Sequence, residues 1–180
     1  MNNKLTKRLG LAALLAGLGA GSAFGDSATG TTNLQVTVAP EASIVVDTAT
    51  TPLTSSGIFG DYTGTTGYTY KIRTTQSTGS GSVVLQISSD FAPTGGPSVG
   101  SPVNGDTLSY TCTTTAPATA CSGSQTSSTS TTTPVASFGA DAHSLAAGTS
   151  GNTTIWDLTN DPAYQTGSYQ ATATYTIAAL

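Results

Sequence analysis

The C-terminal stretch YQATATYTI, residues 169–177, alternates apolar and polar side chains. A period of two places one set of side chains on one face of a β-strand and the other set on the opposite face. The apolar set is Tyr169, Ala171, Ala173, Tyr175 and Ile177. A parallel strand that is buried on both faces would instead be apolar throughout. The stretch therefore predicts an antiparallel strand with one buried face.

The same alternation recurs along the chain, in segments separated by Gly, Pro and Asn. The clearest segments are residues 34–38, 44–46, 68–73, 82–89, 108–112 and 155–158. Short alternating strands at such spacing predict an all-β fold, an immunoglobulin-like antiparallel β-sandwich of about seven strands. We expect two exposed loops, because residues 92–102 are rich in Gly and Pro and residues 122–133 are nearly all Ser and Thr.

The charge balance restricts the partners of the protein. Only 8% of the 180 residues are charged, with five Lys and Arg against nine Asp and Glu. Three of the basic residues, Lys4, Lys7 and Arg8, lie in the first ten positions, so the remainder has two basic residues against nine acidic ones. An acidic surface repels phosphate groups. We therefore expect no nucleic-acid partner and no docking on an anionic membrane.

The N-terminus has the layout of a secretory signal peptide. Its three basic residues precede an apolar run at 9–20, and small residues follow at Gly21, Ser22, Ala23 and Gly25. A spanning helix needs about 20 strongly apolar residues, whereas this run is short and rich in Gly and Ala. We expect residues 1–25 to be removed after Gly25 and the mature chain to be exported without membrane insertion.

Export favours a disulfide between Cys112 and Cys121, the two cysteines of the chain. They flank a stretch with Pro117 that is typical of a turn, so the bond would close one local loop. Two thiols without a neighbouring His or a second Cys pair do not make a tetrahedral metal site. We expect no metal and no other cofactor.

The mature chain has few groups suited to catalysis. His143 is its one histidine and lies between Asp141 and Ser144. Neighbouring residues of an extended chain point to opposite faces, whereas the members of a catalytic triad converge from distant loops. We expect His143 to be a surface residue and the protein not to be an enzyme. Asn152-Thr153-Thr154 matches a glycosylation acceptor, a tripeptide that often arises by chance.

Residues 26–40 form an N-terminal extension before a sandwich domain at 41–180. Leu34, Val36 and Val38 alternate with polar residues, and Ala39-Pro40 separates them from the next alternating segment. Two interpretations remain open. The segment is either the first strand of its own sandwich or a strand that pairs with the sheet edge of a neighbouring subunit.

Several segments together resemble the spore coat protein U domain, which is related to the pilins of archaic chaperone-usher systems. They are Leu34 to Val46, Phe59-Gly60-Asp61-Tyr62, Tyr68 to Thr74, and Gly167-Ser168-Tyr169 before the last strand. The likeness spans most of the mature chain, although the family's Cys near Ala42 or Ser43 is absent. It implies an incomplete sandwich that a periplasmic chaperone fills first and the N-terminal extension of the next subunit fills later. Gly167 is fourteenth from the C-terminus, where many pilins carry a Gly.

A second resemblance involves Trp156-Asp157-Leu158, which is similar to a motif of the WxL cell-wall-binding domain. A Trp buried between the two sheets is a common feature of sandwich folds. We therefore expect Trp156 to be a core residue.

The first resemblance implies an exported structural subunit of a bacterial surface fibre, pilus or coat. Such a subunit assembles as a homo-polymer by N-terminal strand donation. A periplasmic chaperone and an usher are its further expected partners. The expected donor face is Leu34, Val36 and Val38. The expected acceptor strand carries Gly167, Tyr169, Ala171, Ala173, Tyr175 and Ile177. The alternative is a monomeric cell-surface module that binds carbohydrate or cell wall through Tyr62, Tyr68 or Trp156.

Overall fold

The computed structural model describes residues 28–180, and the predicted signal peptide lies outside this range. Residues 37–180 form one compact unit. Among residues 28–180, no helix has the length and apolar character needed to cross a membrane. The one helical element there is a short 3-10 turn, η1 (Val103–Gly105).

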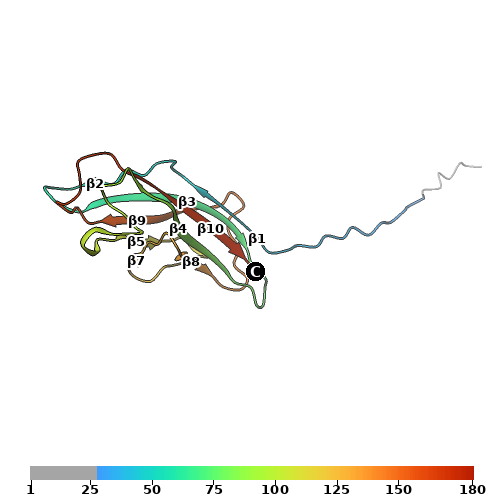
Figure 1. The fold of residues 1–180 in the computed structure, drawn as a ribbon. Coiled ribbons are helices and arrows are strands. Elements are labelled where there is room, and N and C mark those ends of the chain that lie inside the picture. The colour runs from blue at the N-terminus through green and yellow to red at the C-terminus, as the bar shows by residue number, and fades with distance from the viewer. Residues whose placement is uncertain (1–27) are drawn as a thin grey trace, which may run out of the picture. The chain divides into compact units, whose positions relative to one another are not determined.

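The unit is an antiparallel β-sandwich, as the alternation predicted (Figure 1). The first sheet has the order β1-β3-β9-β5-β7, with β2 paired to β3, and the second has the order β10-β4-β8-β6. The strands of the first sheet are β1 (Glu41–Val46), β2 (Thr54–Ser55), β3 (Tyr62–Arg73), β5 (Leu108–Thr113), β7 (Gln125–Thr126) and β9 (Thr149–Leu158). Those of the second are β4 (Gly81–Ala92), β6 (Thr119–Ala120), β8 (Thr133–Phe138) and β10 (Gln170–Ala179).

Seven of these strands have six or more residues, which agrees with the expected number, and three have two residues. Across the first sheet, the long strands β1, β3, β9 and β5 lie in the order of strands A, B, E and D of an immunoglobulin domain. Strands β4 and β10 then occupy the positions of strands C and F. In that domain, strand G pairs with the free side of strand F, and β10 has no strand on that side in the described chain.

The core lies between the sheets and follows the period of two. Side chains at alternate positions of β3 and β4 are fully buried, and the positions between them are not. The buried members are Tyr68, Tyr70, Ile72, Val83, Leu85 and Ile87. Trp156 is 5% exposed, which confirms it as a core residue, and its Nε1 donates a hydrogen bond to Thr66 Oγ1 at 2.8 Å. Its ring packs edge-on against that of Tyr110, with centroids 5.4 Å apart.

The prediction of an exposed loop over 122–133 was only partly right, since most of its side chains are exposed but it also contains regular structure. The segment contains β7, and Ser127 within it is buried. Ser127 N donates to Leu108 O in the first sheet, and Ser128 O accepts from Ile87 N in the second. Main-chain hydrogen bonds, which side-chain composition does not reveal, therefore hold this Ser/Thr segment. Residues 92–102 do follow β4 without regular structure, although Gly96 and Pro97 are buried there.

The sequence did not predict strand β8 either. Its pairing with β4 shifts register between Val83 and Val84, and the strand contains Pro134. A register shift breaks the strict alternation of inward and outward side chains. The two neighbours Val135 and Ala136 are accordingly both buried.

Candidate functional site

One edge of the sandwich is open. Strand β10 ends the second sheet and pairs with β4, while β1 ends the first sheet and pairs with β3. The two edge strands lie side by side, and no strand pairing joins them in the described chain. An edge strand presents a row of main-chain N–H and C=O groups that are free to pair with another strand.

The inward face of β10 is incompletely covered. Its inward apolar side chains are half-buried, and the side chains between them are exposed. The half-buried set is Ala171, Ala173, Tyr175, Ile177 and Ala179. In the neighbouring strand β4, by contrast, the inward side chains of Val83, Leu85 and Ile87 are at most 2% exposed. Both strands alternate inward and outward side chains, so the difference comes from what covers them.

A groove of about 1310 Å³ lies at one end of this edge, where Val46 ends β1 and Gln170 begins β10. It is larger than the roughly 300–1,000 Å³ of a typical small-molecule site. The floor is apolar and consists of Ile87, Leu108, Trp156 and Leu158. The walls are the segment 46–53 after β1, the tip of the β2–β3 connection at Ile58 and Phe59, and residues 160–173.

Tyr169 stands in one wall and is locked in place. Its ring lies over Gly96, where an added Cβ would come within 2.4 Å of a ring atom. Its hydroxyl donates to Gln165 O at 2.8 Å, and Gln165 N donates to Gly95 O at 2.8 Å. Gly167, expected at the start of the acceptor strand, lies in the exposed loop before β10. The strand begins at Gln170 because the preceding residues pack on the Gly95–Gly96 turn.

Buried polar atoms without partners lie beneath β10. The hydroxyls of Tyr68, Tyr175 and Thr154 are buried and make no hydrogen bond. Burial raises the pKa of Tyr175 to about 12 and also raises the pKa of Tyr68. Both phenols are therefore neutral at physiological pH.

The predicted donor segment is exposed. Leu34 is 94% exposed, Val36 82% and Val38 61%, and residues 28–40 contain no strand. In the described chain, the first strand of the sandwich is therefore β1 and not residues 34–38. Arg73 holds the beginning of β1, since its Nε donates to Ala39 O at 2.9 Å and its Nη2 pairs with Glu41 Oε2 at 3.0 Å.

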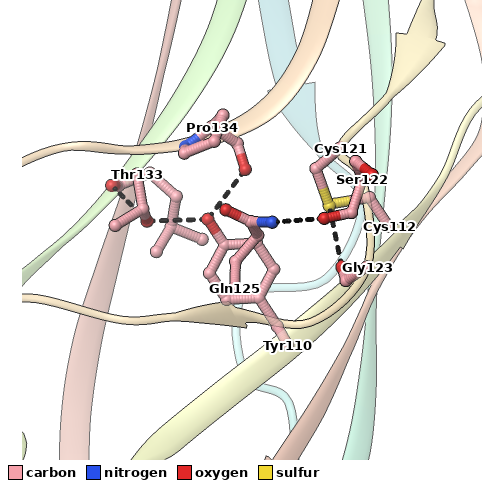
Figure 2. The surroundings of a disulfide bond; sticks show 9 residues. Tyr110, Cys112, Cys121, Ser122, Gly123, Gln125, Thr133 and Pro134 are labelled. Atoms are coloured by element: carbon pink, nitrogen blue, oxygen red, sulfur yellow. Dashed lines mark hydrogen bonds between the residues drawn. A yellow bond between two sulfur atoms is a disulfide. The ribbon is translucent and has the colours of Figure 1, made fainter.

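The opposite edge is closed, partly by the predicted disulfide between Cys112 and Cys121, whose Cα atoms lie 5.6 Å apart (Figure 2). The bond does more than staple a local loop. Cys112 belongs to β5 in the first sheet, whereas Cys121 follows β6 in the second and donates its N–H to Val135 O. The bond therefore joins the two sheets.

Tyr110 strengthens the same connection. Its hydroxyl lies 2.6 Å from Thr133 Oγ1 and 2.9 Å from Pro134 O, so it links β5 to β8. Figure 2 shows this contact beside the disulfide, together with the hydrogen bond from Gln125 Nε2 to Ser122 O.

The other sequence candidates do not form a site. His143 is exposed and contacts Asp141 Oδ1 at 2.8 Å, but Ser144 Oγ accepts a hydrogen bond from Ile72 N instead of facing the imidazole. Asn152 is fully buried, and its amide group donates to Tyr68 O and Thr149 O, so it is not accessible for glycosylation in the folded chain. Among residues 28–180, no three His, Cys, Asp or Glu side chains gather closely enough to bind one metal ion.

The aromatic side chains expected to bind carbohydrate in the alternative function are largely buried. Tyr68 and Trp156 are buried, and Tyr62 is half-buried. A sugar ring needs an exposed aromatic face, which Tyr68 and Trp156 do not present.

No protein-family model matches the chain, and neither a curated protein nor a solved structure gives a match.

Proposed function

We propose that the protein is an exported structural subunit that polymerises by strand donation, residues 28–40 of one copy adding to the open edge of the next. One observation carries the proposal. The same chain contains a groove that reaches the start of the free edge strand β10 and an exposed, alternating apolar segment. In strand addition, main-chain hydrogen bonds supply affinity and alternate side chains supply specificity.

The segment and the groove are chemically matched. Residues 28–40 contain no charged side chain, so their burial requires no charge to be desolvated. Full burial of a Val or Leu side chain contributes about 1.5–3 kcal/mol. Leu34, Val36 and Val38 would therefore supply most of the apolar free energy, and an added strand would cover the half-buried face of β10.

The resemblance to spore coat protein U domains agrees with this assembly and extends it to a bacterial surface, with a chaperone and an usher in the periplasm. A disulfide fits an oxidising compartment. Under this proposal the role of the protein is structural and not enzymatic.

The test compares two charge substitutions on opposite faces of the segment. Val36→Asp would place a carboxylate in the apolar groove, which is costly, and should abolish polymer while leaving an exported monomer. Thr37→Asp places the same charge on the other face and should leave polymer intact. Size-exclusion chromatography and negative-stain microscopy of the exported protein give the readout. Unchanged polymer in Val36→Asp would contradict strand donation.

A further inference from the structure

The tip of the β2–β3 connection displays two large apolar side chains. Ile58 is 95% exposed and Phe59 63% exposed, on a surface otherwise dominated by Ser and Thr. Exposed neighbours of this size are a common mark of a contact surface.

The backbone of the tip is held in one conformation by hydrogen bonds. Phe59 has φ 53°, a left-handed conformation that is rare for a bulky residue and costs free energy. Ser55 Oγ lies 2.7 Å from Gly57 O and 2.6 Å from Gly60 O, so its single proton is shared between the two carbonyls, and Gly60 N donates to Gly57 O. Little conformational entropy would be lost when such a fixed tip binds.

The position of the tip identifies what it contacts. Ile58 and Phe59 line the groove together with residues 160–162 and 164–169. Asn160 Nδ2 donates to Gly60 O, and Asn160 N donates to Asp61 Oδ1, so the tip is tied to that wall. A strand bound in this groove therefore has these two side chains among the residues that it can contact.

We propose that Ile58 and Phe59 are the apolar anchor of the acceptor groove and contact residues 28–40 of a second copy. The inference rests on the proposed function. The occupant follows from chemistry, because the segment is uncharged, presents exposed Leu34, Val36 and Val38, and is supplied by every copy of the chain. The groove also exceeds the volume of a typical small-molecule site.

The test measures binding of a synthetic peptide of residues 28–40 to the full chain carrying Val36→Asp, which disables donation but leaves the groove unchanged. In this background, Ile58→Ser with Phe59→Asn removes both apolar side chains, and Asn tolerates the left-handed backbone. We expect the peptide to bind at least about tenfold more weakly, since part of the apolar burial is lost.

Leu145→Ser is the matched control, because Leu145 is 69% exposed and does not line the groove. It should bind the peptide like the background protein, and circular dichroism with thermal melting should show all three proteins equally folded. Equal affinity in the tip variant would overturn the anchor and leave strand donation standing. Failure of the background protein to bind the peptide would overturn both proposals.

Discussion

The two edges of the sandwich are opposites. At the edge of β6 and β7, the disulfide and the Tyr110 hydroxyl join the sheets, and short strands complete them. At the edge of β1 and β10, the sheets share no strand pairing in the described chain, and the inward side chains of β10 are half-buried. The closed edge gains stability within one chain, whereas the open edge can gain the same kind of stability only from an added strand.

This difference explains why alternating strands are fully buried in one place and half-buried in another. Strands β4 and β10 are neighbours that both alternate inward and outward side chains, but β4 lies between two strands and β10 pairs with one. Burial depends on coverage from both the facing sheet and the sides. The open edge is thus a property of position in the sheet and not of strand composition.

The largest effect should come from shortening core side chains on the two strands. Leu85→Ala in β4 leaves a cavity in a fully covered layer and should lower the free energy of unfolding by about 3–4 kcal/mol. Ile177→Ala in β10 should cost about 1–2 kcal/mol, because its side chain is already partly hydrated. Urea unfolding in the Val36→Asp background measures both. Equal costs would mean that the edge is covered in solution.

Removal of the disulfide should open the closed edge. Cys112→Ser with Cys121→Ser should lower the free energy of unfolding by about 2–3 kcal/mol, because the bond closes a short loop. Wild-type protein under reducing conditions should show the same loss. A melting temperature that is unchanged in both samples would show that hydrogen bonds alone hold this edge.

A methyl group at Gly96 should disturb the wall of the open edge. In Gly96→Ala the Cβ would meet the Tyr169 ring at 2.4 Å, so the ring must move, at a cost of about 1–3 kcal/mol. The variant should also bind the 28–40 peptide more weakly. Gly139→Ala is the control, because its added Cβ meets nothing within 4 Å. Equal thermal stability of the two variants would contradict the locked position of Tyr169.

The smallest expected effect is a loss of stability at acid pH, through Asp90. Burial raises the pKa of Asp90, but hydrogen bonds from Val99 N, Gly100 N, Ser98 Oγ and Phe91 N outweigh it and bring the pKa below its ordinary value. A lowered pKa contributes stability above the unfolded-state pKa of about 3.9, and this contribution is lost as pH falls through the folded-state value.

Asp90 organises the loop that carries Gly96, so acid should loosen the open edge. We expect the thermal stability of Asp90→Asn to depend less on pH below about 4 than that of wild type. Parallel pH dependence of the two proteins would exclude this carboxylate as the cause.

Local pattern was sufficient for most strands and for the cysteine pair. Strands β3, β4, β5, β9 and β10 follow the period of two because their inward faces meet one continuous core. The pattern did not predict strand β8, because a register shift breaks the period of two. It also did not predict the structure around Ser127, because main-chain hydrogen bonds to both sheets hold that segment. The apolar pair Ile58-Phe59 was visible in the sequence, but its exposure was not.

The sequence by itself determined the fold class, the antiparallel character of the sheets and the presence of a disulfide, because these follow from side-chain alternation and from two cysteines close in the chain. The tertiary structure alone decided which edge is open, that the disulfide joins the sheets, and that Ile58, Phe59 and residues 160–169 line one groove. The physical reason is that strand order depends on contacts between residues far apart in the chain. A local pattern specifies a strand and its buried face, but it does not specify the strand's neighbours.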